Sequence, residues 1–296
     1  MTRLTEYAPA KINLSLHVGP PKANQRHDLI SLVSFADQTA ADLLTAIPAS
    51  HFSLAVDGPF AKQSGPAKDN LVLQAARAMN EAMDGQAPAL AFRLQKRLPG
   101  AAGIGGGSAD AGAALRLIVR AHGGEESQAI AEAIAPLLGG DVLACFHRVP
   151  GLMSGEGEMF DPILSLPRLP ALLVNPGIDC PTGPVFAAYD ALSPTLLPDH
   201  PPLPDNRTDV RAFISWLNET TRNSLQSPAM SMHPDITKTL AALQAVAGAR
   251  LIRMSGSGAT CFALFDSMEL ADAAARDVAA QNPDWWVRTS FLGEPL

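Results

Sequence analysis

The residues best placed to do chemistry lie in the stretch "PGAAGIGGGSADAG", which runs from Pro99 to Gly112 and has five glycines between Gly100 and Gly107. An alternating segment precedes this stretch, and an alanine-rich run with helical spacing follows it. Glycines let a phosphate approach the backbone, and a helix N-terminus presents unpaired N–H groups and a partial positive charge. A tight, close-packed strand-to-helix turn is the alternative. Because five glycines exceed what such a turn needs, we predict a phosphate-binding loop.

The common phosphate loops do not match this stretch. A Walker A loop requires a Lys directly after its last glycine, and none follows here. A dinucleotide fingerprint requires an acidic residue at the end of the next strand, about 20 residues on. Glu125 and Glu126 instead follow Gly123-Gly124, which ends a helical run. Both common interpretations are therefore excluded.

A second glycine-containing stretch, "MSGSGATCFALF", begins at Met254 and runs into an apolar segment. Successive backbone N–H groups in such a turn can form an anion-binding nest. Taken alone, the stretch is typical of a tight turn before a strand. Taken with the first stretch, it predicts a second wall of one anion site.

Two charged residues stand out by their neighbours. Lys11 opens the alternating segment "KINLSLHV", and Lys is rarely buried unless it is paired, although a Lys at a strand edge is usually solvated. Asp141 lies in "PLLGGDVLACF" with apolar residues on both sides. A carboxylate there either caps a helix or turn, or pairs with a cation. Both interpretations of Asp141 stay open at this level.

The spacing of apolar residues predicts the helices and strands that must position these residues. Alternation predicts half-buried strands over 11–18, 51–58 and 89–99, and helical spacing predicts helices over 69–83, with Asp69 or Asn70 as N-cap, and from Ser108 or Asp110 to 122. Further along, the patterns predict a strand over 171–177, a helix over 233–249, and strand–helix–strand over 261–292, an ingredient of a split βαβ unit. Because strands and helices do not alternate strictly, the class is α+β. Prolines near 162–170 predict two domains, 1–165 and 166–296.

Composition restricts the partners. The net charge is −7 without Lys/Arg runs, which makes nucleic acid a poor partner. Cys145, Cys180 and Cys261 lack metal-ligand spacing and are predicted to be buried reduced thiols. The most apolar segment is interrupted by charges and glycines, so no membrane span is expected. We expect a cytoplasmic location. The expected partners are small molecules; the oligomeric state is not predicted.

Three segments, "APAKINLSLHV", "LPGAAGIGGGSADAGAALR" and "RMSGSGATCFALF", occur in the order of the three motifs of the GHMP small-molecule kinases, which the chain resembles. More narrowly, it resembles the branch that phosphorylates the 2-hydroxyl of a methylerythritol unit linked to cytidine diphosphate, in non-mevalonate isoprenoid synthesis. The resemblance implies two α+β lobes with the active site between them, and ATP with Mg²⁺. The alternatives are a GHMP kinase for another small alcohol, or a GHMP-fold protein that binds a ligand without turnover.

The resemblance also implies roles for particular residues. Asp141 would be the general base, and Lys11 would hold it ionised and offset charge in the transition state. The nucleotide phosphates would be wrapped by Pro99, Gly100, Ala101, Ala102, Gly103, Ile104, Gly105, Gly106, Gly107, Ser108 and Ala109. The substrate would be bound by Asn13, Arg26, His27, Phe186, Gly256, Ser257 and Gly258. No side chain is assigned as a metal ligand.

The chain departs from the pattern of this branch at Gly140 and Leu143 beside Asp141, at Thr182-Gly183 before Phe186, and in one loop. Where the branch has Asp-Gly-Tyr-His, this chain has Asn24-Gln25-Arg26-His27. The Tyr that would stack on cytosine is therefore Arg26. A guanidinium also stacks on a flat ring, so Arg26 can take over the stacking role. The alternative is that the loop 20–28 is solvated and that Arg26 points into water, and both interpretations stay open.

Overall fold

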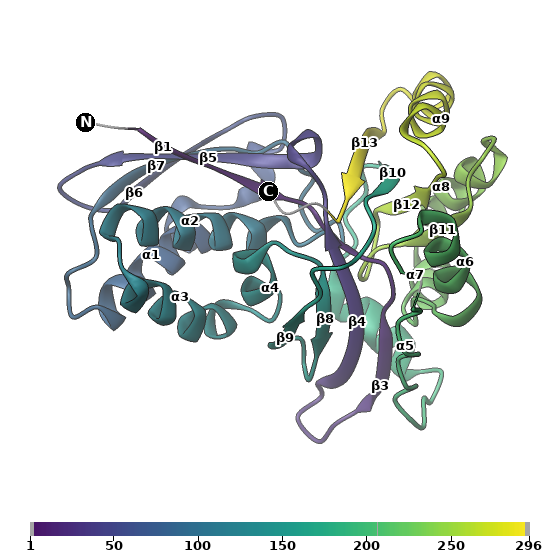
Figure 1. The fold of residues 1–296 in the computed structure, drawn as a ribbon, viewed down its shortest axis with the longest axis horizontal. Helices are drawn as coiled ribbons and strands as arrows, with labels where there is room; N and C mark the ends of the chain where they lie inside the picture. Colours follow the sequence, from purple (N-terminus) through teal and green to yellow (C-terminus); the bar gives the residue numbers. More distant parts are fainter. Residues whose placement is uncertain (1–2, 206, 294–296) are drawn as a thin grey trace.

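The computed structural model describes residues 3–205 and 207–293, which form three sheets with helices packed around them (Figure 1). The first sheet has the order β1-β5-β7-β6, antiparallel except for the parallel pair β6–β7. The helices of this part lie below the sheet in the view of Figure 1. The strands and helices of this part are β1 (Leu4–Pro9), β5 (Ala41–Pro48), β6 (Ser53–Asp57), β7 (Leu90–Gln95), α1 (Leu71–Ala82), α2 (Gly106–His122), α3 (Glu125–Leu138) and α4 (Val142–His147).

The second sheet lies in the middle of the molecule. It is built on β4, which pairs with β2, β3 and β8, and β9 extends it from β8. Its strands are β2 (Lys11–Asn13), β3 (His17–Pro21), β4 (His27–Phe35), β8 (Gly151–Ser154) and β9 (Met159–Pro162).

The prediction of one half-buried strand over 11–18 is wrong in two respects. The segment is broken between β2 and β3, and the side chains of Asn13, Ser15 and His17 are as buried as the apolar ones between them. The reason is that residues from elsewhere in the chain cover the polar side chains: Ser15 Oγ lies 3.1 Å from His200 Nε2, and His17 Nδ1 lies 3.2 Å from the Asp199 carbonyl oxygen. Hydrogen bonds satisfy the buried Ser15 hydroxyl, which accepts a bond from the Leu32 amide and contacts His200.

The third sheet has the antiparallel order β11-β12-β10-β13, with its helices at the other end of the molecule (Figure 1). Strands β12 and β13 both run antiparallel to β10, which lies between them, and α9 connects them. This arrangement confirms the predicted split βαβ unit. The elements here are β10 (Leu169–Asn175), α5 (Thr182–Asp190), α6 (Val210–Thr220), α7 (Gln226–Met232), α8 (Pro234–Ala245), β11 (Leu251–Met254), β12 (Cys261–Leu264), α9 (Met268–Gln281) and β13 (Trp286–Leu292).

Helix ends follow local chemistry. The Asn70 side chain accepts a bond from the Val72 amide, so Asn70, rather than Asp69, is the N-cap of α1. Helix α2 begins at Gly106, earlier than predicted, because Gly105 adopts the left-handed conformation (φ 62°) at the N-cap position and provides no side-chain cap. The first-turn N–H groups of α2 therefore have no capping side chain. Gly123 ends α2 as predicted.

Apolar packing joins the two halves of the chain. One buried cluster combines Ile12, Leu98 and Ile104 with Leu173 and Phe262, which come from both sides of residue 165. The boundary between 165 and 166 falls between β9 and β10, and it stays a prediction. All three cysteines are free and buried. Among the described residues, no helix is long and apolar enough to span a bilayer.

Candidate active site

The two glycine stretches are in direct backbone contact. A Cβ on Gly103 would lie 2.3 Å from the Ser255 carbonyl oxygen, and one on Gly256 would lie 2.7 Å from the Gly103 oxygen. The Ser255 hydroxyl donates to the Gly103 carbonyl at 2.9 Å, and the Thr260 amide donates to the Ala102 carbonyl at 3.1 Å. Packing therefore requires glycine at positions 103 and 256. At Gly103 this agrees with the alternative interpretation of the whole first glycine stretch as a close-packed turn.

The next three glycines have a different environment. A Cβ on Gly105 would lie 3.4 Å from the Lys11 side chain and 3.5 Å from Asp141 Oδ2, and one on Gly106 would lie 3.4 Å from Lys96 Nζ. For Gly107 the nearest atom is in the Leu71 side chain, at 3.5 Å. None of these contacts is with backbone, so packing alone does not demand glycine at 106 and 107. The uncapped N-terminus of α2 here faces charged side chains and an open cavity.

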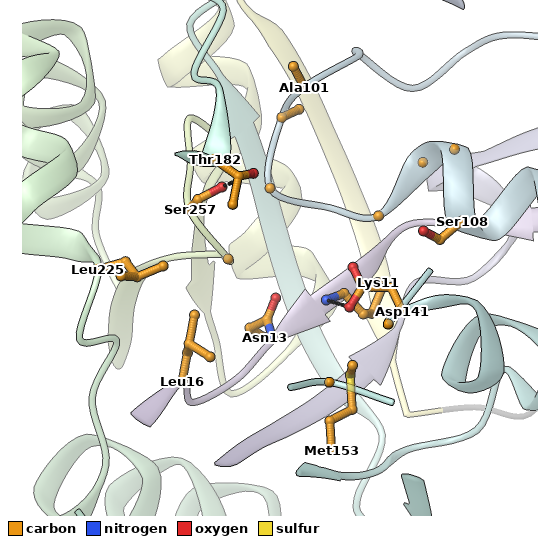
Figure 2. Close-up of a pocket in the computed structure, with 18 of the residues that line it drawn as sticks. Lys11, Asn13, Leu16, Ala101, Ser108, Asp141, Met153, Thr182, Leu225 and Ser257 are labelled. Atoms are coloured by element: carbon orange, nitrogen blue, oxygen red, sulfur yellow. Dashed lines mark hydrogen bonds and ion pairs between the residues drawn. The ribbon is translucent and has the colours of Figure 1, made fainter. Parts of the chain in front are cut away.

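A cavity of about 490 Å³ lies between the first glycine stretch, β2, the β8–β9 turn and the third sheet with its helices (Figure 2). Most of the predicted site residues line it: Lys11, Asn13, Pro99, Gly100, Ala101, Ala102, Gly103, Gly105, Gly106, Gly107, Ser108, Asp141, Phe186, Gly256 and Ser257. Ile104 and Ala109 are instead buried in apolar clusters, and Gly258 packs close to Met254, where a Cβ would lie 2.9 Å from Sδ.

Lys11 and Asp141 form an ion pair, with 2.8 Å between Lys11 Nζ and Asp141 Oδ1 (Figure 2). The Lys11 side chain is 5% exposed and that of Asp141 is 32% exposed. Asp141 occupies the N-cap position of α4, but its side chain makes no capping hydrogen bond. Of the two interpretations that the sequence left open, the structure therefore favours pairing with a cation.

Asn13 lies on the same wall of the cavity. Its Nδ2 donates to the Ser31 hydroxyl at 2.7 Å, whereas its buried Oδ1 has no hydrogen-bond partner among the described residues. An unpaired buried acceptor is costly unless a ligand or water satisfies it. Across the cavity, Thr182 Oγ1 and Ser257 Oγ lie 3.0 Å apart (Figure 2).

Lys96 is a cavity-lining cation that sequence reasoning missed. Its Nζ lies 2.5 Å from Asp42 Oδ2 and 2.8 Å from Asp110 Oδ2, and all three residues are buried. Burial alone would lower the pKa of Lys96, but the charges of Asp110 and Asp42 outweigh it and raise that pKa above its usual range. Burial raises the pKa of Asp110 well above its usual value, against the lowering effect of Lys96. The available signal was a Lys on the apolar face of the segment 89–99, aligned with Leu94 and Leu98.

A second cavity of about 510 Å³ adjoins the first and shares Leu29, Glu156 and Phe186 with it. Arg26 and His27 line this cavity and not the first. His27 Nε2 lies 2.7 Å from Asp190 Oδ1, and the His27 ring centroid is 4.8 Å from that of Phe186. Apart from Gly258, the predicted substrate residues thus divide between two adjoining cavities, with Phe186 at the boundary.

Sequence profiles of two families match the chain. The GHMP kinases N-terminal domain matches residues 70–148, which include the first glycine stretch, and the GHMP kinases C-terminal domain matches residues 205–284, which include the second. A crystal structure of homoserine kinase from Cytophaga hutchinsonii, 17% identical, has the same fold, with a TM-score of 0.64 over 98% of this chain and 96% of that one. The fold and the matched domains define a GHMP kinase, which confirms the predicted α+β class.

Closer relatives narrow this class. A protein from Hyphomonas neptunium, 49% identical over 98% of this chain and 97% of its own length, is named 4-diphosphocytidyl-2-C-methyl-D-erythritol kinase. One from Caulobacter vibrioides with the same name is 43% identical over 98% of this chain and 99% of its own. A crystal structure of 4-(cytidine 5'-diphospho)-2C-methyl-D-erythritol kinase, 29% identical, superposes with a TM-score of 0.78 over 99% and 100% of the two chains. The chain belongs to this family of small-molecule kinases, as its resemblance predicted.

Proposed function

We propose that the protein transfers the γ-phosphoryl group of ATP to the 2-hydroxyl of 4-diphosphocytidyl-2-C-methyl-D-erythritol, a step of non-mevalonate isoprenoid synthesis. The observation that carries the proposal is the Lys11–Asp141 pair, which lies beside Gly105 at the uncapped N-terminus of α2. The names of the 43–49% identical relatives supply the substrate. A cytoplasmic site of action is part of the same proposal, because three free cysteines suit a reducing compartment.

The first cavity would hold the nucleotide phosphates. Helix α2 has 17 residues, and its first-turn N–H groups combine with its dipole to favour an anion. Gly106 and Gly107 leave room for phosphate oxygens to approach, and Lys96 lies under the loop as a fixed cation. The rest of Pro99–Ala109 would shape the loop, with Ile104 and Ala109 acting through packing.

The reaction needs little covalent chemistry from the protein, because phosphoryl transfer depends mostly on positioning and charge stabilisation. Asp141 would accept the proton of the substrate hydroxyl as its oxygen bonds to the γ-phosphorus and the bond to the β–γ bridging oxygen breaks. Lys11 favours the ionised form of Asp141, which a base requires, and offsets charge that develops on the phosphoryl oxygens.

Mg²⁺ fits this site only as a partner of the nucleotide. Among residues 3–205 and 207–293, no group of three His, Cys, Asp or Glu side chains could enclose a metal ion. Mg²⁺ in phosphoryl-transfer sites keeps several waters and takes one or two protein ligands together with substrate phosphates. The Ser108 hydroxyl, which lines the cavity, is the donor that would contact it. The ion would supply charge neutralisation of the phosphates.

The second cavity would hold the cytosine end of the substrate. Because the two cavities adjoin at Phe186, a long substrate can place its base against His27 and Arg26 and its polyol near Asp141. The unpaired Oδ1 of Asn13 would accept a hydrogen bond from the substrate in the first cavity. Gly256 and Ser257 would close the opposite wall, with Gly258 fixing their turn.

Asp141→Asn tests the proposal, because it removes the proton acceptor and keeps the shape. We expect turnover with the cytidylyl substrate to fall by about 10²–10⁴-fold, while nucleotide affinity measured by calorimetry stays near wild type. Asp84→Asn, the same change at an exposed position, is the matched control. Wild-type turnover in Asp141→Asn would remove Asp141 from the chemistry.

A further inference from the structure

The carboxylate of Glu156 contacts three hydrogen-bond donors, all from one loop. Glu156 lies in the turn between β8 and β9, and it pairs with Lys22 at 2.8 Å, Asn24 at 3.1 Å and Arg26 at 2.9 Å. These three residues belong to the turn between β3 and β4. Glu156 also lines both cavities, so it lies where they meet.

The turn that carries Glu156 is itself fixed. The Leu29 amide of β4 donates to the Gly155 carbonyl at 2.7 Å, and the Glu156 amide donates to Glu158 Oε2 at 2.6 Å. Gly155 and Gly157 have positive φ values of 68° and 108°, which favour glycine on either side of Glu156. Bonds from Lys22, Arg26 and Asn24 lower the pKa of Glu156 to about 2, so it is ionised at neutral pH.

Unlike the turn that carries Glu156, the Arg26 side chain has few contacts with the described residues to fix it. Its side chain is 72% exposed, and in the described part of the chain Glu156 is the carboxylate with which its guanidinium pairs. Several torsions separate this guanidinium from the backbone, so an unheld Arg loses much rotamer freedom on presenting a flat face to a ligand. A rigid aromatic ring at the same position would need no such partner.

We propose that Glu156 is a positioning residue that holds the Arg26 guanidinium as a flat wall of the second cavity, against which the base of a cytidine nucleotide stacks. This inference rests on the proposed function, and it adds a residue that acts through Arg26 and not on the reacting atoms. It explains how position 26 serves a base site without an aromatic ring. Its consequence is specific: Glu156 matters for base binding only while residue 26 is an arginine.

A double-mutant cycle tests this dependence. The affinity for cytidine 5'-diphosphate is measured by calorimetry with saturating ADP, in wild type, Glu156→Gln, Arg26→Tyr and the double variant. We expect Glu156→Gln to weaken binding by about fivefold, the upper range for an exposed ion pair. In the Arg26→Tyr background the same change should have no effect, because the ring is rigid.

Two further measurements separate the inference from simpler explanations. Asp28→Asn removes a carboxylate that pairs with Lys22 at 3.0 Å and not with Arg26, and it should leave the affinity unchanged. In turnover assays, Glu156→Gln should raise KM for the cytidylyl substrate and change kcat and KM for ATP by less than about twofold.

Other outcomes overturn the inference. An equal loss in both backgrounds would mean that Glu156 only holds the loop through Lys22 and Asn24. Tighter binding in Glu156→Gln would mean that the carboxylate repels the ligand directly. Because the cycle is measured by binding, a wild-type protein that fails to phosphorylate the cytidylyl substrate would refute the proposed function separately.

Discussion

Gly103 and Gly106 lie in one loop, but alanine at the two positions should have opposite consequences. At Gly103 the φ is +71°, and the new Cβ would lie 2.3 Å from the Ser255 oxygen and 2.8 Å from the Gly258 amide nitrogen. A non-glycine residue in the left-handed region costs about 1–2 kcal/mol, and overpacking against fixed atoms costs about 1–3 kcal/mol. We therefore expect Gly103→Ala to lower the free energy of unfolding by about 2–5 kcal/mol.

Gly106→Ala is the matched comparison. Its Cβ would lie 3.4–3.9 Å from side-chain atoms of Lys96 and Leu98, which is ordinary or slightly tight contact. Gly-to-Ala in a helix is favourable by up to about 1 kcal/mol, so stability should be unchanged or slightly higher. The methyl group would, however, occupy space that a phosphate needs, and nucleotide affinity should fall.

Urea unfolding followed by circular dichroism, together with calorimetric titration of ATP, measures both quantities in both variants. The expected pattern is a stability loss for Gly103→Ala and an affinity loss for Gly106→Ala. If Gly103→Ala is as stable as wild type, the two glycine stretches are not in backbone contact. If stable Gly106→Ala binds ATP like wild type, the phosphates do not approach the α2 N-terminus.

Three further predictions concern buried groups. Lys96→Met leaves two buried carboxylates without their cation and should cost about 3–5 kcal/mol in urea unfolding, whereas the exposed Lys62→Met should cost little; equal costs would contradict the buried triad. Burial, helped by nearby Arg222, lowers the pKa of His17, and burial also lowers the pKa of His200. Unfolded histidine titrates near pH 6.5, so below that pH the unfolded chain binds protons that the folded chain does not. The free energy of unfolding should therefore fall as the pH is lowered. A free energy of unfolding that stays constant down to about pH 5.5 would refute this pH dependence. So would an equally large fall in the variant that carries both His17→Gln and His200→Gln. Burial raises the pKa of all three cysteine thiols, so a thiol reagent should label them only after unfolding, and rapid labelling of native protein would be the opposite result.

Local patterns in the sequence were sufficient for much of the fold. Helix α1 and its N-cap Asn70, the end of α2 at Gly123 and the strand–helix–strand at the C-terminal end of the chain are set by neighbouring residues, and the structure confirms them. The strand over 11–18 failed for a nonlocal reason, since alternation does not reveal that His200 and Asp199, far along the chain, contact the buried side chains of Ser15 and His17.

The site required contacts that no local pattern contains. Lys11 and Asp141 are 130 residues apart in sequence, so the sequence could offer each as charged but not as a pair. The spacing of glycines predicted a phosphate loop over the whole stretch, but it does not separate Gly103, which packs against another loop, from Gly106, which faces the cavity. The role of Glu156 depends on three donors across a turn–turn contact.

The most direct test of the proposed activity is to incubate the protein with ATP, Mg²⁺ and 4-diphosphocytidyl-2-C-methyl-D-erythritol and to follow both products by phosphorus NMR. ADP should form in equal amount to a product that carries a new phosphomonoester at the 2-position, and Asp141→Asn should form neither at a comparable rate. Simple polyols without cytidine should be poor substrates. No phosphorylated product from the cytidylyl substrate, or faster turnover of a simple polyol, would contradict the account.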